Sequence, residues 1–169
     1  IAGATASTYT LVALDSGTTI TFEVTPVAAT GTTPGTAVVS PVGLTVVNSA
    51  PIASAVSITD DNGGSVVVGD SLTGNYTYSD TDGDSEGVSA YRWLRDATPI
   101  AGATASTYTL VALDSGTTIT FEVTPVAATG ILTGTPVVSP AGLTVVNSAP
   151  VASAVSITDD NGGSVVVGD

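Results

Sequence analysis

The sequence predicts an all-β protein built as an antiparallel β-sandwich, and three observations lead to this prediction. Apolar and polar residues alternate with a period of two in several short segments, which is the pattern of half-buried strands. Clusters of Gly, Asp and Asn separate these segments, as tight turns require. No long segment has the apolar spacing of an amphipathic helix.

The clearest strand is TTITFEVTPV, residues 117–126, in which Ile119, Phe121 and Val123 share one face. Other strands are expected at LTGNYTYS (72–79), AYRWLR (90–95) and STYTLVA (106–112). Turns are expected at DDNGG (60–64), DTDGDSEG (80–87), DATP (96–99), LDSG (113–116) and ATGILTG (128–134).

The single tryptophan, Trp93, lies in AYRWLR, which we expect to be the third strand of the complete repeat. Seven or so short strands in about 100 residues, with a tryptophan on the third, predict an immunoglobulin-like sandwich. Because the chain has no cysteine, no disulfide can support the core. We therefore expect Trp93 to form its centre, packed against Tyr76, Ile119 and Phe121.

A long repeat divides the chain. Residues 1–31 are identical to residues 100–130, and residues 48–70 return at 147–169 with one change. Both pairs are offset by 99 residues. Near-identical copies at a domain-sized period predict tandem repeats of 99 residues.

The motif NSAP, at 48–51 and 147–150, is the expected joint, because proline favours an extended restart of the chain. Residues 1–49 would then be the C-terminal half of a preceding repeat and 50–148 a complete repeat. Residues 149–169 would be the N-terminal strands of the next repeat. Neither partial copy contains the equivalent of residues 71–99, so we expect the native polypeptide to be longer.

Composition excludes several function classes. The chain has 15 acidic residues against two arginines, for a net charge of −13, whereas nucleic-acid binding needs clustered Lys and Arg. It lacks His, Cys and Lys, which leaves an enzyme few nucleophiles or bases, so no catalytic residue is predicted. No apolar run is long enough to span a membrane.

Two stretches resemble a known family. VGDSLTGNYTYSD, from Val68 on, and YRWLRDATPIAGATASTYTLVALDSGTTITFEV, ending at Val123, resemble the bacterial immunoglobulin-like tandem repeats of large surface proteins and adhesins. The resemblance implies an immunoglobulin-like fold, an extracellular or cell-surface location, and service as a stalk, a spacer or occasionally a binder. The acidic loop after the second strand departs from the family pattern.

That loop, SDTDGDSEG, places a carboxylate at every second position: Asp80, Asp82, Asp84 and Glu86. Alternating carboxylates in a tight glycine-containing loop suit a hard, oxygen-seeking cation, and Ca²⁺ suits a flexible loop better than Mg²⁺. The spacing does not match an EF-hand, because Ser85 and Tyr91 stand at the glycine and closing glutamate positions. The alternative is a solvated polar loop with no ligand.

In a sandwich, a loop between the second and third strands faces the preceding domain. We therefore expect residues 80–86 to approach the last loops of that domain, including Asp15, and to form a calcium clamp between domains. Asp60, Asp61 and Asn62 are weaker candidates, because Asp-Asn-Gly is already explained as a turn.

Two further features stand out. Arg95 or Arg92 is expected to pair with Asp114 or Asp96 at the sandwich edge. Asn75 begins a formal glycosylation sequon, Asn-Tyr-Thr.

The predicted function is architectural: a tandem-repeat module of a long extracellular stalk or filament, stiffened by calcium at its joints. Its partners would be neighbouring repeats of the same chain, with lateral self-association as an addition. The alternative is a carbohydrate- or surface-binding module of a secreted protein.

Overall fold

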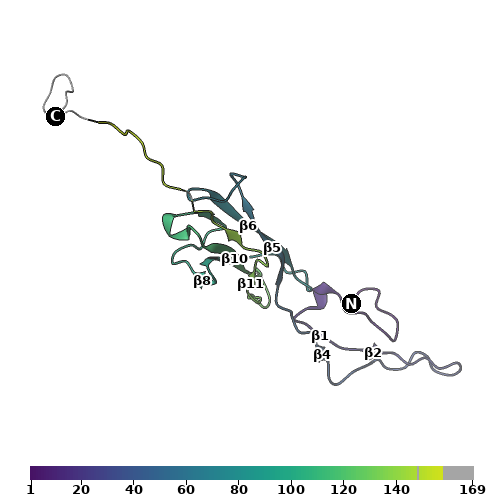
Figure 1. The fold of residues 1–169 in the computed structure, drawn as a ribbon. Helices are drawn as coiled ribbons and strands as arrows, with labels where there is room; N and C mark the ends of the chain where they lie inside the picture. Colours follow the sequence, from purple (N-terminus) through teal and green to yellow (C-terminus); the bar gives the residue numbers. More distant parts are fainter. Residues whose placement is uncertain (148, 158–169) are drawn as a thin grey trace, which may run out of the picture.

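Two antiparallel sheets packed face to face form the central part of the chain (Figure 1). The structure, a computed structural model, describes residues 1–147 and 149–157. One sheet has the order β5-β6-β9, and the other has the order β8-β7-β10-β11, with β12 also pairing with β10. The bounds are β5 Ile52–Asp60, β6 Ser71–Ser79, β7 Ala90–Arg95, β8 Thr98–Pro99, β9 Thr107–Thr109, β10 Thr118–Thr124, β11 Val137–Val138 and β12 Leu143–Thr144. The prediction of an all-β antiparallel fold is confirmed.

The core lies between the two sheets and follows the predicted alternation on β10. Ile119, Phe121 and Val123 are fully buried, while Thr120 and Glu122 between them are partly exposed. The opposite sheet contributes Leu72 from β6 and small residues from β5. Since each buried side chain of this size contributes roughly 1.5–3 kcal/mol, this face of β10 is a main source of the stability of the sandwich.

Trp93 lies on β7 and is fully buried, as expected. Its ring centroid is 5.0 Å from that of Phe121, and it stacks on Tyr108 at 5.7 Å. Its indole N–H donates to the carbonyl of Ala105 at 2.9 Å. Tyr76 packs at the edge of the cluster that contains Trp93, and its ring lies beside that of Tyr91 at 5.9 Å.

Gly74, in the middle of β6, makes room for the core. A side-chain carbon at this position would collide with the ring of Phe121. Because glycine weakens a strand interior by itself, the close approach of the aromatic ring explains why it stands there.

Residues 1–49 form the same strand pairs as the second half of the sandwich, but they do not form a sandwich themselves. They form the 3-10 turn η1 (Ala13–Asp15) and the strands β1 (Thr19–Ile20), β2 (Glu23–Val24), β3 (Val38–Val39) and β4 (Leu44–Thr45). The pairs β1–β4 and β2–β3 have the register that β10 has with β12 and β11, shifted by one repeat. A second 3-10 turn, η2 (Ala112–Asp114), likewise matches η1.

The apolar side chains of this half are exposed. Phe22 is 53% exposed, whereas the identical position in the second copy, Phe121, is fully buried. Among the described residues, no second sheet covers β1 and β2, because the equivalents of β6 and β7 are not in the sequence before residue 50.

The two ends of the chain leave the sandwich on opposite sides. Residues 1–49 lie beyond one end of it, and residues 149–157 run away from the other end (Figure 1). The latter repeat residues 50–58 with one change but form no strand. The remainder of the predicted next repeat, 158–169, lies outside the described residues. Within the described part, no helix is long and apolar enough to cross a membrane.

Candidate functional site

The acidic loop between β6 and β7 lies against the preceding half of the chain, as expected. Gly83, at φ +80°, is so close to η1 that a side-chain carbon there would lie 3.5 Å from Cβ of Ala13. The loop thus approaches Ala13, two residues before Asp15. The carboxylate of Asp15 accepts hydrogen bonds within its own half, from Tyr9 and from the amide of Val12.

Asp84 makes the central contact of this joint. Its Oδ2 accepts a hydrogen bond from the side-chain amide of Asn48 at 2.8 Å. Its Oδ1 accepts one from the hydroxyl of Thr129, in the loop after β10. The bonds from Thr129 and Asn48 favour the ionised form and hold the pKa of Asp84 below its usual range.

Asp82 and Asp80 organise the rest of the loop. Asp82 accepts a hydrogen bond from the amide of Ser49 at 2.5 Å, which gives a second contact with the NSAP motif. Asp80 turns inward, and its Oδ1 accepts bonds from the amides of Asp82 at 2.8 Å and Asp84 at 3.4 Å. These bonds fix the loop in the shape that presents the other two carboxylates to the preceding half.

Glu86 faces its own sandwich. Its carboxylate accepts hydrogen bonds from the hydroxyl of Tyr76 and, at 2.5 Å, from the hydroxyl of Ser89. The phenol oxygen of Tyr76 also lies 3.0 Å from that of Tyr91. Burial, followed by the bond to Glu86, raises the pKa of Tyr76, so this phenol stays a donor over the physiological range. Glu86 therefore anchors the loop to β6 and β7.

The four predicted ligands do not converge on one point. In the ranges that the structure describes, no group of three or more carboxylates is arranged to hold a metal ion. Within this loop, Oδ2 of Asp80 is buried and accepts no hydrogen bond from any described residue, as is also true of Oδ2 of Asp60 on the turn between β5 and β6. Calcium binding stays a prediction, and Asp80 is the residue on which it now depends.

Asn48 is the residue that sequence reasoning missed. Besides Asp84, its amide nitrogen donates to the hydroxyl of Ser16 at 2.9 Å. Its Oδ1 accepts a hydrogen bond from the backbone amide of Ile131 at 2.5 Å. The repeated NSAP motif marked this position as a joint, but nothing local indicated which loops its first residue would contact.

The two arginines form the ion pairs of the sandwich edge. Arg95 pairs with the fully buried carboxylate of Asp114, as one of the predicted combinations had it. Arg92 pairs with Glu122 at 2.7 Å, a partner that had not been predicted. Asp96 accepts instead from the amide of Thr118 at 2.9 Å.

The weaker candidates have local roles. Asp60 accepts from the amide of Asn62 at 3.1 Å, and Asn62 in turn accepts from the amide of Ser71 at 2.8 Å, so both stabilise the turn between β5 and β6. Asp61 accepts from the hydroxyl of Thr73. Asn75 is exposed on β6, and its amide donates to the hydroxyl of Thr59 at 3.0 Å.

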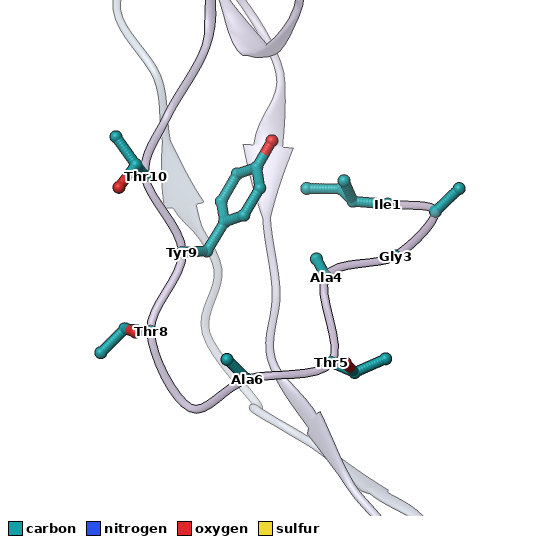
Figure 2. A pocket seen from close by; sticks show the side chains of 9 residues that line it. Ile1, Gly3, Ala4, Thr5, Ala6, Thr8, Tyr9 and Thr10 are labelled. Carbon is teal, nitrogen blue, oxygen red and sulfur yellow. The ribbon is translucent and has the colours of Figure 1, made fainter.

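Two shallow hollows are lined by the two copies of the segment IAGATASTYT. The first, of about 460 Å³, lies within residues 1–10, where Ile1 and Ala4 face the ring of Tyr9 (Figure 2). The second, of about 560 Å³, lies between residues 100–109 and Arg95. Alanine and threonine dominate both linings, and both tyrosine hydroxyls already donate to aspartates of their own turns.

Comparisons with known proteins give no match to this chain, whether with protein-family models, with curated protein sequences or with solved structures.

Proposed function

We propose that this chain is a structural tandem-repeat module of a long extracellular stalk or filament. The observation that carries the proposal is the joint, where the acidic loop of one copy contacts Ala13, Asn48 and Ser49 of the copy before it. The chain arrives at one end of the sandwich and leaves at the other (Figure 1). Copies joined in this way stack in line, which is the geometry that a spacer needs.

The proposed domain type is an immunoglobulin-like sandwich in repeats of 99 residues. Its support is the strand order, β5-β6-β9 against β8-β7-β10-β11, with a buried tryptophan on the third strand of the complete copy. The identical registers of the hairpins in the two copies agree with this division.

The stalk proposal is tested on the native protein and on the cells that make it. At about 3.3 Å per strand residue, each repeat should add roughly 35 Å to the length of the particle seen by electron microscopy. Protease added to intact cells should release fragments of this sequence. A compact particle, or a sequence that protease reaches only after lysis, would contradict the proposal.

The calcium part of the proposal places Ca²⁺ at Asp80, Asp82, Asp84 and Glu86. Its support is the buried, unpartnered oxygen of Asp80 together with the density of carboxylates around it. Calorimetric titration should give a Kd of about 10⁻⁴ to 10⁻³ M, the range of extracellular sites. Asp80→Asn should abolish the heat, while Asp61→Asn, on the distant turn, should not. If the parent chain gives no heat, calcium plays no part at the joint.

The alternative function, carbohydrate binding, lacks its main candidate group. Sugar rings commonly stack on exposed aromatic side chains, but Trp93 is fully buried and its indole N–H is bonded to Ala105. The stalk function therefore accounts for more of the described contacts.

A further inference from the structure

The contacts of the Asn48 side chain indicate how one repeat is oriented relative to the next. This inference rests on the proposed stalk function. We propose that Asn48 is a joint residue, bound by the following repeat in a cup made of Asp84, Gly130 and the amide of Ile131. Its counterpart Asn147 would present the same side chain to the repeat after that. The partner of this surface is thus another copy of the same repeat.

Both ends of the Asn48 carboxamide are used. Its nitrogen donates to Asp84 on the following copy and to Ser16 on its own copy, at 2.8 and 2.9 Å. Its oxygen accepts from the amide of Ile131 at 2.5 Å. Among side chains as short as that of asparagine, only the carboxamide supplies two donor hydrogens and an acceptor. An aspartate would put a second negative charge against Asp84, and an alanine would reach neither side.

Gly130 forms the floor of the cup. A side-chain carbon there would collide with both polar atoms of Asn48 and with the carboxylate of Asp84. Its φ of +70° also favours glycine. The identical position in the first copy, Gly31, has a similar φ of +89°, but no described atom lies within 4 Å of where its side chain would be. The cup is therefore filled around Gly130, whereas the space around Gly31 is open.

The cup tolerates sequence change where the copies differ. Ile131 contributes its backbone amide, so the threonine at the same place in the first copy, Thr32, would serve equally. The loop that varies most between the copies can thus differ without loss of the joint. Ser49 adds a second backbone contact, its amide donating to Asp82.

The described hydrogen bonds of Asn48 and Ser49 all run between protein groups, and the proposal is that they hold the joint whether or not a cation is bound. The experiment is hydrogen exchange of the whole 169-residue chain, followed at the amides of Ser49 and Ile131 in EDTA and in calcium. Asn48→Ala should raise exchange at Ile131 roughly tenfold, as expected for the loss of one hydrogen bond to this amide. Asn48→Asp should raise it at least as much.

Asn147→Ala is the matched control. The acidic loop occurs once in this chain, so Asn147 has no second cup to fill and its replacement should leave exchange at Ile131 unchanged. The fluorescence of Trp93 reports that the sandwich is folded in each variant. If neither Asn48 variant changes the exchange, or if EDTA alone abolishes the protection, the proposal is wrong.

This result is separable from that of the proposed function. Exchange at Ile131 tests the joint in the isolated chain, whereas protease treatment of intact cells tests the location. If the joint is protected from exchange but the protein is not at the cell surface, the stalk function is contradicted and the proposal for Asn48 is still supported.

Discussion

Arg95 holds a carboxylate that is completely shielded from solvent: its Nε lies 2.7 Å and a terminal nitrogen 2.5 Å from Oδ1 of Asp114. The other oxygen of Asp114 accepts from the hydroxyl of Tyr108 at 2.9 Å and from the amide of Val111 at 2.7 Å. The first copy has the same turn around Asp15, with Tyr9 and Val12, but no residue equivalent to Arg95.

Asp114→Ala should lower the free energy of unfolding of the sandwich by about 3–5 kcal/mol, because it leaves the donors of Arg95, Tyr108 and Val111 without this acceptor. Urea denaturation followed by the fluorescence of Trp93 measures the change. Asp15→Ala removes the identical residue from the half outside the sandwich and should shift this transition by less than about 0.5 kcal/mol. Equal effects of the two variants would show that the buried ion pair contributes nothing.

Phe121→Ala should also destabilise the sandwich by about 3–5 kcal/mol, the range for a buried aromatic side chain. Phe121 is fully buried under Gly74, and its ring lies against Trp93. Phe22→Ala, at the identical position of the first copy, should leave the transition unchanged, since Phe22 is exposed. A large effect of Phe22→Ala in the isolated chain would mean that residues 1–49 pack against the sandwich more closely than described.

The joint should weaken in acid through Asp84. The hydrogen bonds from Thr129 and Asn48 lower the pKa of Asp84 below its ordinary value of 3.8. The undocked state therefore binds a proton more readily than the docked state. The contribution of Asp84 is complete above pH 3.8 and is lost as the pH falls through the lowered value of the docked state.

Nuclear magnetic resonance can follow this titration at the carboxyl carbon of Asp84. Asn48→Ala removes one of the two donors, so it should raise the measured pKa toward the ordinary value, while Asn147→Ala should not change it. An unchanged titration in Asn48→Ala would show that the bond between Asn48 and Asp84 does not form in solution.

Ala97→Gly should stabilise the protein. Ala97 lies in the turn between β7 and β8 at φ +62°, a left-handed conformation that costs a residue with a side chain about 1 kcal/mol. Glycine relieves this cost, so the melting temperature should rise by several degrees. Ala101→Gly, in the next turn but without a positive φ, should lower stability slightly. A fall in melting temperature for both variants would refute the argument.

Local pattern was enough to predict β6, β7 and β10, but it gave no strand at β5 and placed β8 inside an expected turn. The alternation of Ile119, Phe121 and Val123 is a property of adjacent residues, and it orients β10. The same hairpin register forms in residues 1–49 without a second sheet, because turn chemistry and ladder hydrogen bonds act between residues that are close in the chain. The pairing of Arg95 with Asp114 is one of the combinations that the sequence left open, and the structure selects it.

The tertiary structure alone decided which of two identical side chains is buried and which loop meets the joint. Phe22 and Phe121 have the same neighbours in sequence, but burial requires a second sheet, and that depends on strands far along the chain. Tyr108 rather than Tyr76 stacks on Trp93 because the packing of β9 against β7 brings the two rings together. Asn48 reaches Ile131 across 83 residues of sequence. Its side chain finds that amide only after two folded ends have come together, and no local pattern encodes such a contact.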